Sequence, residues 1–138
     1  MIKETENLEG SGRLGAAIGS EPVSKGWILF FWAASLFNFV IGALGMFSPE
    51  ATIDARIVSL LVFCFGIIYL LVARDPLRFG PALWAGLIGK LGVVGLLGPA
   101  ALEPGADAAI LPILCVDALF ALAFVVFLFV RSDDLSAK

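Results

Sequence analysis

The chain has 138 residues, of which 60% are hydrophobic and 15% charged, and its mean hydropathy is +1.01. Soluble domains usually carry about 45–50% apolar and about 25% charged residues, so this composition excludes a soluble globular protein. The net charge is −3 and the sequence has no basic cluster. We therefore expect no binding of nucleic acid, which requires lysine and arginine to hold the phosphates.

The sequence contains no histidine and two cysteines, Cys64 and Cys115. Without histidine, His-ligated haem and zinc sites are excluded, and so are Ser-His-Asp and Cys-His catalytic groups. The two cysteines lie in apolar stretches and form no CxxC pattern. We expect them to be ordinary buried small residues, and we expect no metal site and no cofactor.

Four long apolar stretches occupy residues 26–47, 57–73, 81–98 and 108–130. A helix needs about 20 residues, at about 1.5 Å each, to cross a hydrocarbon core of about 30 Å. Because lipid offers no hydrogen bonds to the backbone, each stretch is predicted to be a transmembrane helix. The sequence therefore predicts an all-α integral membrane protein.

The connections between these stretches are short and contain proline and glycine, which end helices. Short connections make consecutive helices antiparallel neighbours. We predict an antiparallel four-helix bundle over residues 26–131. The polar residues 1–25 are predicted to be a flexible tail, and residues 132–138 a second tail.

Lysine and arginine are distributed unevenly over the predicted loops and tails. One side of the bundle carries seven of them: Lys3, Arg13, Lys25, Arg74, Arg78, Arg131 and Lys138. The other side carries Arg56 alone. Positively charged segments stay in the cytoplasm, so we predict a multi-pass protein of the bacterial inner membrane with both termini cytoplasmic. A signal peptide cleaved near residues 43–45 is the competing interpretation, but the long acidic tail before the first apolar stretch argues against it.

Three polar residues lie near the middle of predicted spans: Asn38, Lys90 and Asp117. A charged side chain at that depth costs about 2.5–3.5 kcal/mol on insertion scales, so it should face protein or water. Lys90 lies eight residues before the end of the third span and Asp117 nine after the start of the fourth. Both are then roughly 12–14 Å from the outer end of antiparallel neighbours. We predict an ion pair between them.

Small residues form stripes on the predicted helices. Asn38 shares one face of the first span with Gly42 and Gly45, and Gly66 lies on a similar stripe of the second span. Small residues let helix backbones approach each other in membranes, so we assign these glycines to helix packing. Asn38 is predicted to form a polar contact between helices.

The third span has a glycine at every third position: Gly86, Gly89, Gly92, Gly95 and Gly98. Each step of three residues turns the stripe back by about 60°, so the glycines wind around the helix. They follow the groove between side-chain ridges and can admit a neighbouring helix at close range. We assign Gly86, Gly89, Gly92 and Gly95 to helix packing.

The arrangement of spans and loops resembles that of small bacterial four-helix inner-membrane proteins of the DoxX-like or unknown-function kind. The resemblance rests on Ser48-Pro49-Glu50 with Arg56 at the start of the second span, and on Ala73-Arg74-Asp75-Pro76 at its end. It covers the four spans but not the tail. It implies a four-helix membrane fold and carries over no catalytic residue.

The first functional hypothesis is a non-catalytic membrane protein. It would be an accessory or assembly subunit of a membrane complex, or a bundle that associates with itself, in contact with lipid. The small-residue seams provide packing surface for other helices, and four short-looped helices offer little room for soluble chemistry.

Two alternatives remain open at this point. A small transporter or proton-coupled carrier would use the Lys90–Asp117 pair as a protonation switch, with Asn38 as a polar ligand. A membrane-embedded enzyme, or a site for a lipid or quinone, would use the same two residues for acid–base chemistry. No second group of catalytic residues supports an enzyme, and no inverted repeat supports a carrier.

Overall fold

The computed structural model describes residues 23–136, and side chains up to residue 130. Its elements are α2 (Lys25–Met46), α3 (Ile53–Arg74), α4 (Pro76–Phe79), η2 (Gly80–Ala82), α5 (Leu83–Ala101) and α6 (Ile110–Ser136). Four segments are long and apolar enough to cross a membrane: α2, α3, α4 through α5, and α6. The prediction of an all-helical chain with four candidate membrane spans is therefore confirmed. The tail predicted at 1–25 lies outside the described residues except for its last three.

The boundaries of the second, third and fourth spans differ by three or more residues from those predicted, and α5 runs to Ala101 with Pro99 inside the helix. Helix α3 begins at Ile53 rather than at residue 57, because Thr52 caps it: the Thr52 hydroxyl accepts a hydrogen bond from the Ala55 amide at 3.2 Å. Arg56 consequently lies in the first turn, where it donates to the Ser48 carbonyl at 3.2 Å. Helix α6 continues to residue 136, so most of the second predicted tail is helical.

The connection predicted as a loop between the second and third spans is mostly helical. The Asp75 carboxylate accepts a hydrogen bond from the Arg78 amide at 3.0 Å, and Pro76 occupies the first turn of α4. An aspartate followed by proline is a strong start signal for a helix, because the side chain caps the turn and the ring fixes the backbone. The chain therefore passes through α4 and η2 directly into α5.

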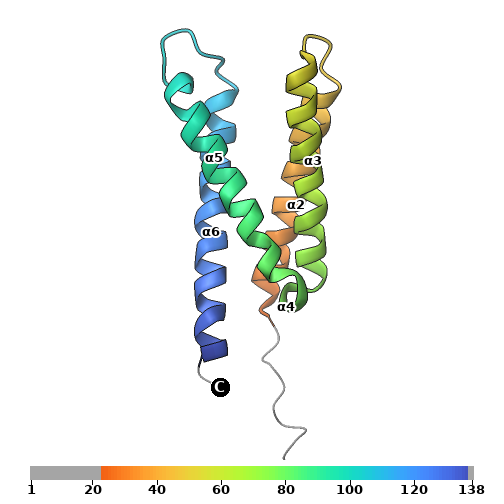
Figure 1. Ribbon diagram of the computed structural model, residues 1–138, viewed down its shortest axis with the longest axis vertical. Coiled ribbons are helices and arrows are strands. Elements are labelled where there is room, and N and C mark those ends of the chain that lie inside the picture. Colours follow the sequence, from red (N-terminus) through yellow and green to blue (C-terminus); the bar gives the residue numbers. More distant parts are fainter. Residues whose placement is uncertain (1–22, 137–138) are drawn as a thin grey trace, which may run out of the picture.

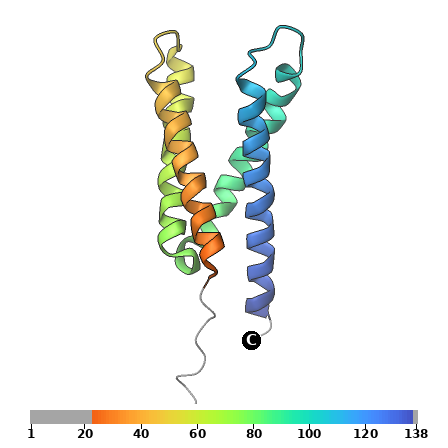
Figure 2. The same ribbon diagram turned by 180° about the vertical axis from the view of Figure 1, so that it is seen from behind.

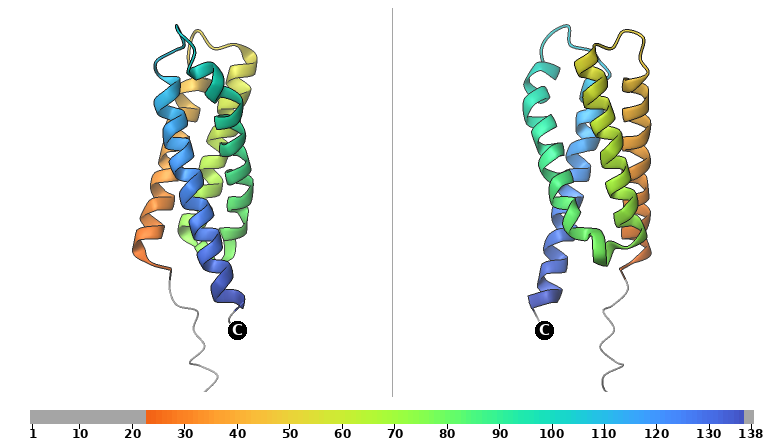
Figure 3. Two further views of the ribbon diagram at one scale, coloured as in Figure 1. Left: turned by 90° about the vertical axis from the view of Figure 1, so that its left-hand side faces the viewer. Right: turned by 45° about the vertical axis from the view of Figure 1, so that its right-hand side comes forward.

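The helices form two antiparallel pairs, α2 with α3 and α5 with α6 (Figure 1). Helix α5 starts beside the end of α3, next to α4, and crosses toward α6 along its length, as the reverse view also shows (Figure 2). The start of α2 and the end of α6 lie at the same end of the molecule (Figures 1 and 3). We call this the near end and the end with the loops after α2 and α5 the far end. The two pairs diverge toward the far end.

An aromatic core in the near half of the molecule joins all four long helices. It consists of Phe31, Ala34, Tyr69, Val72, Ala73, Leu83, Phe124 and Phe127, each of them buried. The Phe31 and Phe127 rings meet edge to face at a centroid distance of 4.9 Å, and the Tyr69 and Phe124 rings lie 5.0 Å apart. Such pairs contribute about 0.5–1.5 kcal/mol each beyond the apolar area that they bury.

Glycines bring α2 and α3 into direct backbone contact. A Cβ atom added to Gly42 would lie 2.6 Å from the Phe63 amide nitrogen and 2.8 Å from the Ser59 carbonyl oxygen, so no larger residue fits. Gly66 faces the Phe39 ring, and the Gly66 carbonyl accepts a hydrogen bond from the Ser35 hydroxyl at 2.8 Å. The predicted stripes of small residues therefore lie at the α2–α3 contact.

The outer surfaces of all four long helices are apolar. Large side chains are well exposed there, among them Leu36, Leu61, Leu96 and Leu119. A soluble protein would bury such residues, whereas a helix in a membrane presents them to lipid. Cys64 and Cys115 are also exposed on these surfaces, which corrects the expectation that they are buried. A thiol is apolar enough to face lipid, so its position in an apolar stretch did not specify a core location.

Candidate functional site

The structure brings Lys90 of α5 and Asp117 of α6 together. The Lys90 ammonium donates a hydrogen bond to Asp117 Oδ1, and the two groups form an ion pair. Both side chains are buried inside the protein, away from the apolar outer surfaces. The antiparallel course of α5 and α6 places the two residues at the same depth, as their positions in the sequence indicate.

Three aromatic rings surround the Lys90 ammonium besides its carboxylate partner. The nitrogen lies 5.7 Å from the ring centroid of Phe37, 5.6 Å from that of Tyr69 and 5.3 Å from that of Phe120. These rings come from α2, α3 and α6, so Lys90 of α5 is in contact with all the other long helices. The negative faces of aromatic rings attract a cation, and this attraction offsets part of the cost of removing the ammonium from water.

A cleft of about 340 Å³ opens between the two helix pairs and reaches the ion pair. Its polar lining residues are Asn38, Ser59, Tyr69, Lys90 and Asp117. The rest of the lining is mainly apolar and comes from all four long helices. The cleft therefore combines apolar walls with a group of polar residues drawn from separate helices, the usual composition of a ligand pocket.

Asn38 does not form the expected contact between helices. Its side-chain Nδ2 donates to the Ala34 carbonyl, one turn earlier in the same helix, at 2.8 Å. The side-chain hydrogen bond from α2 to α3 comes instead from Ser35, one turn nearer the start of the helix. Asn38 is 4% exposed, and its carbonyl Oδ1 accepts no hydrogen bond within residues 23–136. Asn38 belongs to the polar lining of the cleft.

Tyr69 is a site residue to which the sequence assigned no functional role. It is 1% exposed, it lines the cleft, and its hydroxyl makes no hydrogen bond in the part of the chain that the structure describes. A Cβ atom on Gly86 would lie 2.6 Å from that hydroxyl, so Gly86 leaves the space that the hydroxyl occupies. The combination of the chain's one tyrosine with a glycine on the facing helix was the available sequence signal, but pairing them requires the tertiary structure.

The wound glycines of α5 divide into two groups. Gly86 faces the Tyr69 ring, and a Cβ atom on Gly89 would lie 3.4 Å from the Phe65 ring, so these two pack against α3. Gly92 and Gly95 have no described atom within 4 Å of the position of a Cβ. They were predicted to be packing residues, but nothing within residues 23–136 packs on them.

Gly92 and Gly95 do not line the cleft: Gly95 lies on the side of α5 opposite to it, and Gly92 lies between Gly95 and the cleft-lining Gly89 around the helix. Gly92 follows Lys90 by two residues and Gly95 follows Val93 by two, and both Lys90 and Val93 line the cleft. A step of two residues turns a helix by about 200°, so each glycine points away from its cleft-lining neighbour. Gly92 and Gly95 are both exposed.

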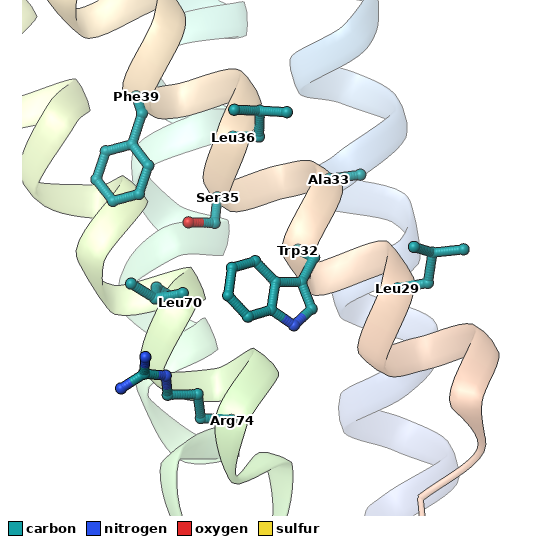
Figure 4. A pocket seen from close by; sticks show the side chains of 8 residues that line it. All are labelled: Leu29, Trp32, Ala33, Ser35, Leu36, Phe39, Leu70 and Arg74. Carbon is teal, nitrogen blue, oxygen red and sulfur yellow. The ribbon is translucent and has the colours of Figure 1, made fainter.

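A second hollow, of about 420 Å³, lies between α2 and α3 on the outer surface (Figure 4). Its lining includes Leu29, Trp32, Leu70 and Arg74, and it is almost entirely apolar. The Ser35 hydroxyl at its base is already bonded to the Gly66 carbonyl. Its charged residue, Arg74, is the last residue of α3, so this hollow, unlike the cleft, has no charged group in the interior of a span.

The chemistry available in the cleft is hydrogen bonding and charge. Among residues 23–136 no three histidine, cysteine or acidic side chains gather as metal ligands. Comparison with known protein families, with curated proteins and with solved structures finds no match to this chain. The resemblance to small four-helix bacterial membrane proteins therefore rests on the arrangement of spans and loops alone.

The ion pair predicts a specific pattern of stability. Lys90→Met and Asp117→Leu should each lower the free energy of unfolding by about 3–5 kcal/mol, because each leaves an uncompensated buried charge. The double variant should recover most of this loss, because it leaves none. Denaturant unfolding of the purified protein in detergent micelles measures all three. A double variant whose loss equals the sum of the two single losses would show that the residues are not coupled.

Proposed function

We propose that this protein is a non-catalytic membrane protein that acts by associating with other membrane helices, as an accessory or assembly subunit or with copies of itself. The observation that supports this proposal is the exposed glycine surface of α5. No described atom lies within 4 Å of a Cβ added at Gly92 or Gly95, and neither glycine lines the cleft. Ile88 and Leu91 on the same side of the helix are exposed as well.

Glycine in the interior of a helix is unfavourable by about 0.5–1 kcal/mol relative to alanine, so exposed glycines need a compensating contact. Gly86 and Gly89 have such contacts within the chain, with Tyr69 and Phe65. In lipid, a helix face of small residues gains when another helix packs closely on it, through van der Waals contacts and weak backbone interactions. A transmembrane helix that is not part of the described chain would supply this contact for Gly92 and Gly95.

Gly95→Leu is the substitution that tests association. The leucine side chain should keep a partner helix at a distance and shift the complex to lower mass. The fold of the single chain should stay intact, because no described atom lies within 4 Å of a Cβ added at this exposed position. Native mass measurement after purification in mild detergent reads out both mass and co-purified chains. Ala118→Leu on the exposed face of α6 is a matched small-to-large control and should change neither. A wild-type chain that purifies as a monomer without partners contradicts the proposal.

The proposed location is the bacterial inner membrane, with the four spans forming one antiparallel bundle whose two termini are cytoplasmic. The seven-to-one distribution of lysine and arginine supports this orientation. The end of α3 at Arg74 and helix α4, which carries Arg78, lie at the near end, together with the start of α2 and the end of α6 (Figure 1).

Fluorescent-protein fusions test the orientation. Green fluorescent protein joined after Lys138 should fluoresce, because it folds in the cytoplasm, and alkaline phosphatase at the same position should be inactive. Alkaline phosphatase inserted after Glu103, in the connection between α5 and α6, should be active. The opposite pattern at both positions would invert the proposed orientation.

A proton-coupled carrier is the second candidate function, and the specific observation in its favour is that the cleft reaches both Lys90 and Asp117. A carrier must also open the opposite side of the pair. The aromatic core, with Phe31, Phe124 and Phe127, fills the near half of the molecule. It therefore blocks access to the ion pair from the near end. For this reason we place the carrier second.

Proton uptake into liposomes tests the carrier. A carrier that uses the pair should acidify vesicles containing a pH-sensitive dye under an imposed gradient, and Asp117→Asn should abolish the flux because the amide cannot bind and release a proton. Thermal unfolding of the same variant controls for loss of fold. Wild-type vesicles that take up no more protons than empty ones exclude proton transport under these conditions.

A further inference from the structure

The polar cleft contains buried hydrogen-bonding groups that the protein leaves without partners. The Tyr69 hydroxyl and Asn38 Oδ1 make no hydrogen bond within residues 23–136, although these residues are only 1% and 4% exposed. In the same region, every fully enclosed polar side-chain atom has a partner. Unpaired groups are thus retained where the cleft can reach them, and buried polar groups usually have a partner.

The ion pair does not satisfy these groups. Lys90 donates to Asp117 Oδ1 and is otherwise enclosed by the rings of Phe37, Tyr69 and Phe120. The second carboxylate oxygen of Asp117 accepts no hydrogen bond from the described chain. The open positions in the cleft are therefore one hydroxyl that can donate or accept, at Tyr69, and acceptor oxygens at Asn38 and Asp117.

We infer that the polar cleft binds a neutral, membrane-soluble molecule with a compact hydroxyl head, a lipophilic alcohol or phenol, whose hydroxyl exchanges hydrogen bonds with Tyr69 and Asn38. A hydroxyl both donates and accepts, so it can donate to the Asn38 oxygen while it accepts from the Tyr69 hydroxyl. The inference does not depend on association through Gly92 and Gly95, because neither residue lines the cleft.

The charge of the cleft favours a neutral ligand. The positive charge of Lys90 is neutralised by the negative charge of its partner Asp117, so the lining offers no excess charge to an anion or a cation. An ionised head would also lose its hydration on entering this region, and no unpaired countercharge in the lining offsets that cost. A neutral hydroxyl avoids this cost.

The depth of the polar groups excludes a phospholipid as the ligand. Asn38 lies eight residues before the end of α2 at Met46, and Lys90 eleven before the end of α5 at Ala101. These separations correspond to about 12 and about 16 Å along the helix axes. A phospholipid headgroup stays at the membrane surface, whereas a small alcohol or phenol dissolves in the hydrocarbon region and can bring its hydroxyl to this depth.

The apolar walls fit the rest of such a molecule. Val58, Val62 and Leu97 line the cleft from α3 and α5. The cleft volume of about 340 Å³ is at the lower end of the range of about 300–1,000 Å³ for small-molecule pockets. A ligand with an apolar body of about eight to ten carbon atoms suits this space.

Photolabelling in lipid nanodiscs tests the inference. The probe is 1-octanol with a diazirine at carbon 3, and octane with the same diazirine is its control without a hydroxyl. Wild-type protein should give adducts on α3 and α5 at the cleft that excess octanol suppresses, and the octane probe should give few such adducts. Tyr69→Phe should reduce the suppressible adducts by about fivefold, the effect of one neutral hydrogen bond.

Two further variants keep the test decisive. Val62→Trp should fill the cleft from α3 and also remove the suppressible adducts, whereas Leu29→Ala, in the outer hollow between α2 and α3, should leave them unchanged. Thermal unfolding verifies that each variant is folded. Labelling spread evenly over the exposed apolar faces, or equal suppressible labelling in wild type, Tyr69→Phe and Val62→Trp, would overturn the proposed site.

Discussion

The contact between Lys90 and Asp117 is the constraint on which the arrangement of the spans depends. Lipid cannot hydrate an ammonium or a carboxylate, so each charge must find its partner inside the protein. The partners belong to adjacent antiparallel helices, and the pair therefore sets both the depth and the facing sides of α5 and α6. The rings of Phe37, Tyr69 and Phe120 extend this constraint to α2 and α3, because they complete the surroundings of the same ammonium.

The two helix pairs are stabilised in different ways. Glycines let α2 and α3 touch through their backbones, at Gly42 in particular, and the Ser35–Gly66 hydrogen bond adds a directional contact. The contact between α5 and α6 includes the charged pair, while their outer surfaces remain apolar. The near halves of all four helices meet in the aromatic core, and the far halves diverge and leave the cleft.

Two different surfaces of the protein are available for function, the cleft and the exposed glycines of α5. The cleft faces inward and has polar groups without partners among residues 23–136, whereas Gly92 and Gly95 are exposed and meet no described side chain. An association through these glycines and a ligand in the cleft would use different residues of α5. Tyr69 links the cleft to the core, because its ring packs on Phe124 while its hydroxyl lies in the cleft lining.

The sequence by itself determined the number of spans, the all-helical fold and the common depth of Lys90 and Asp117. Helix length, rise per residue and the cost of burying a charge fix these features locally. The helix starts at Thr52 and Asp75 were also encoded locally, by capping residues that the loop prediction from proline and glycine did not take into account.

Only the tertiary structure decided which face of each helix meets a neighbour. Helical periodicity puts residues on a common face but leaves the rotation of one helix against the next undetermined. The rotation of α5 places Gly86 and Gly89 against α3 and leaves Gly92 and Gly95 exposed. The rotations of α3 and α6 turn Cys64 and Cys115 outward, and that of α3 brings Tyr69 to the cleft. Packing among residues distant in the sequence sets these rotations, so no single span could reveal them.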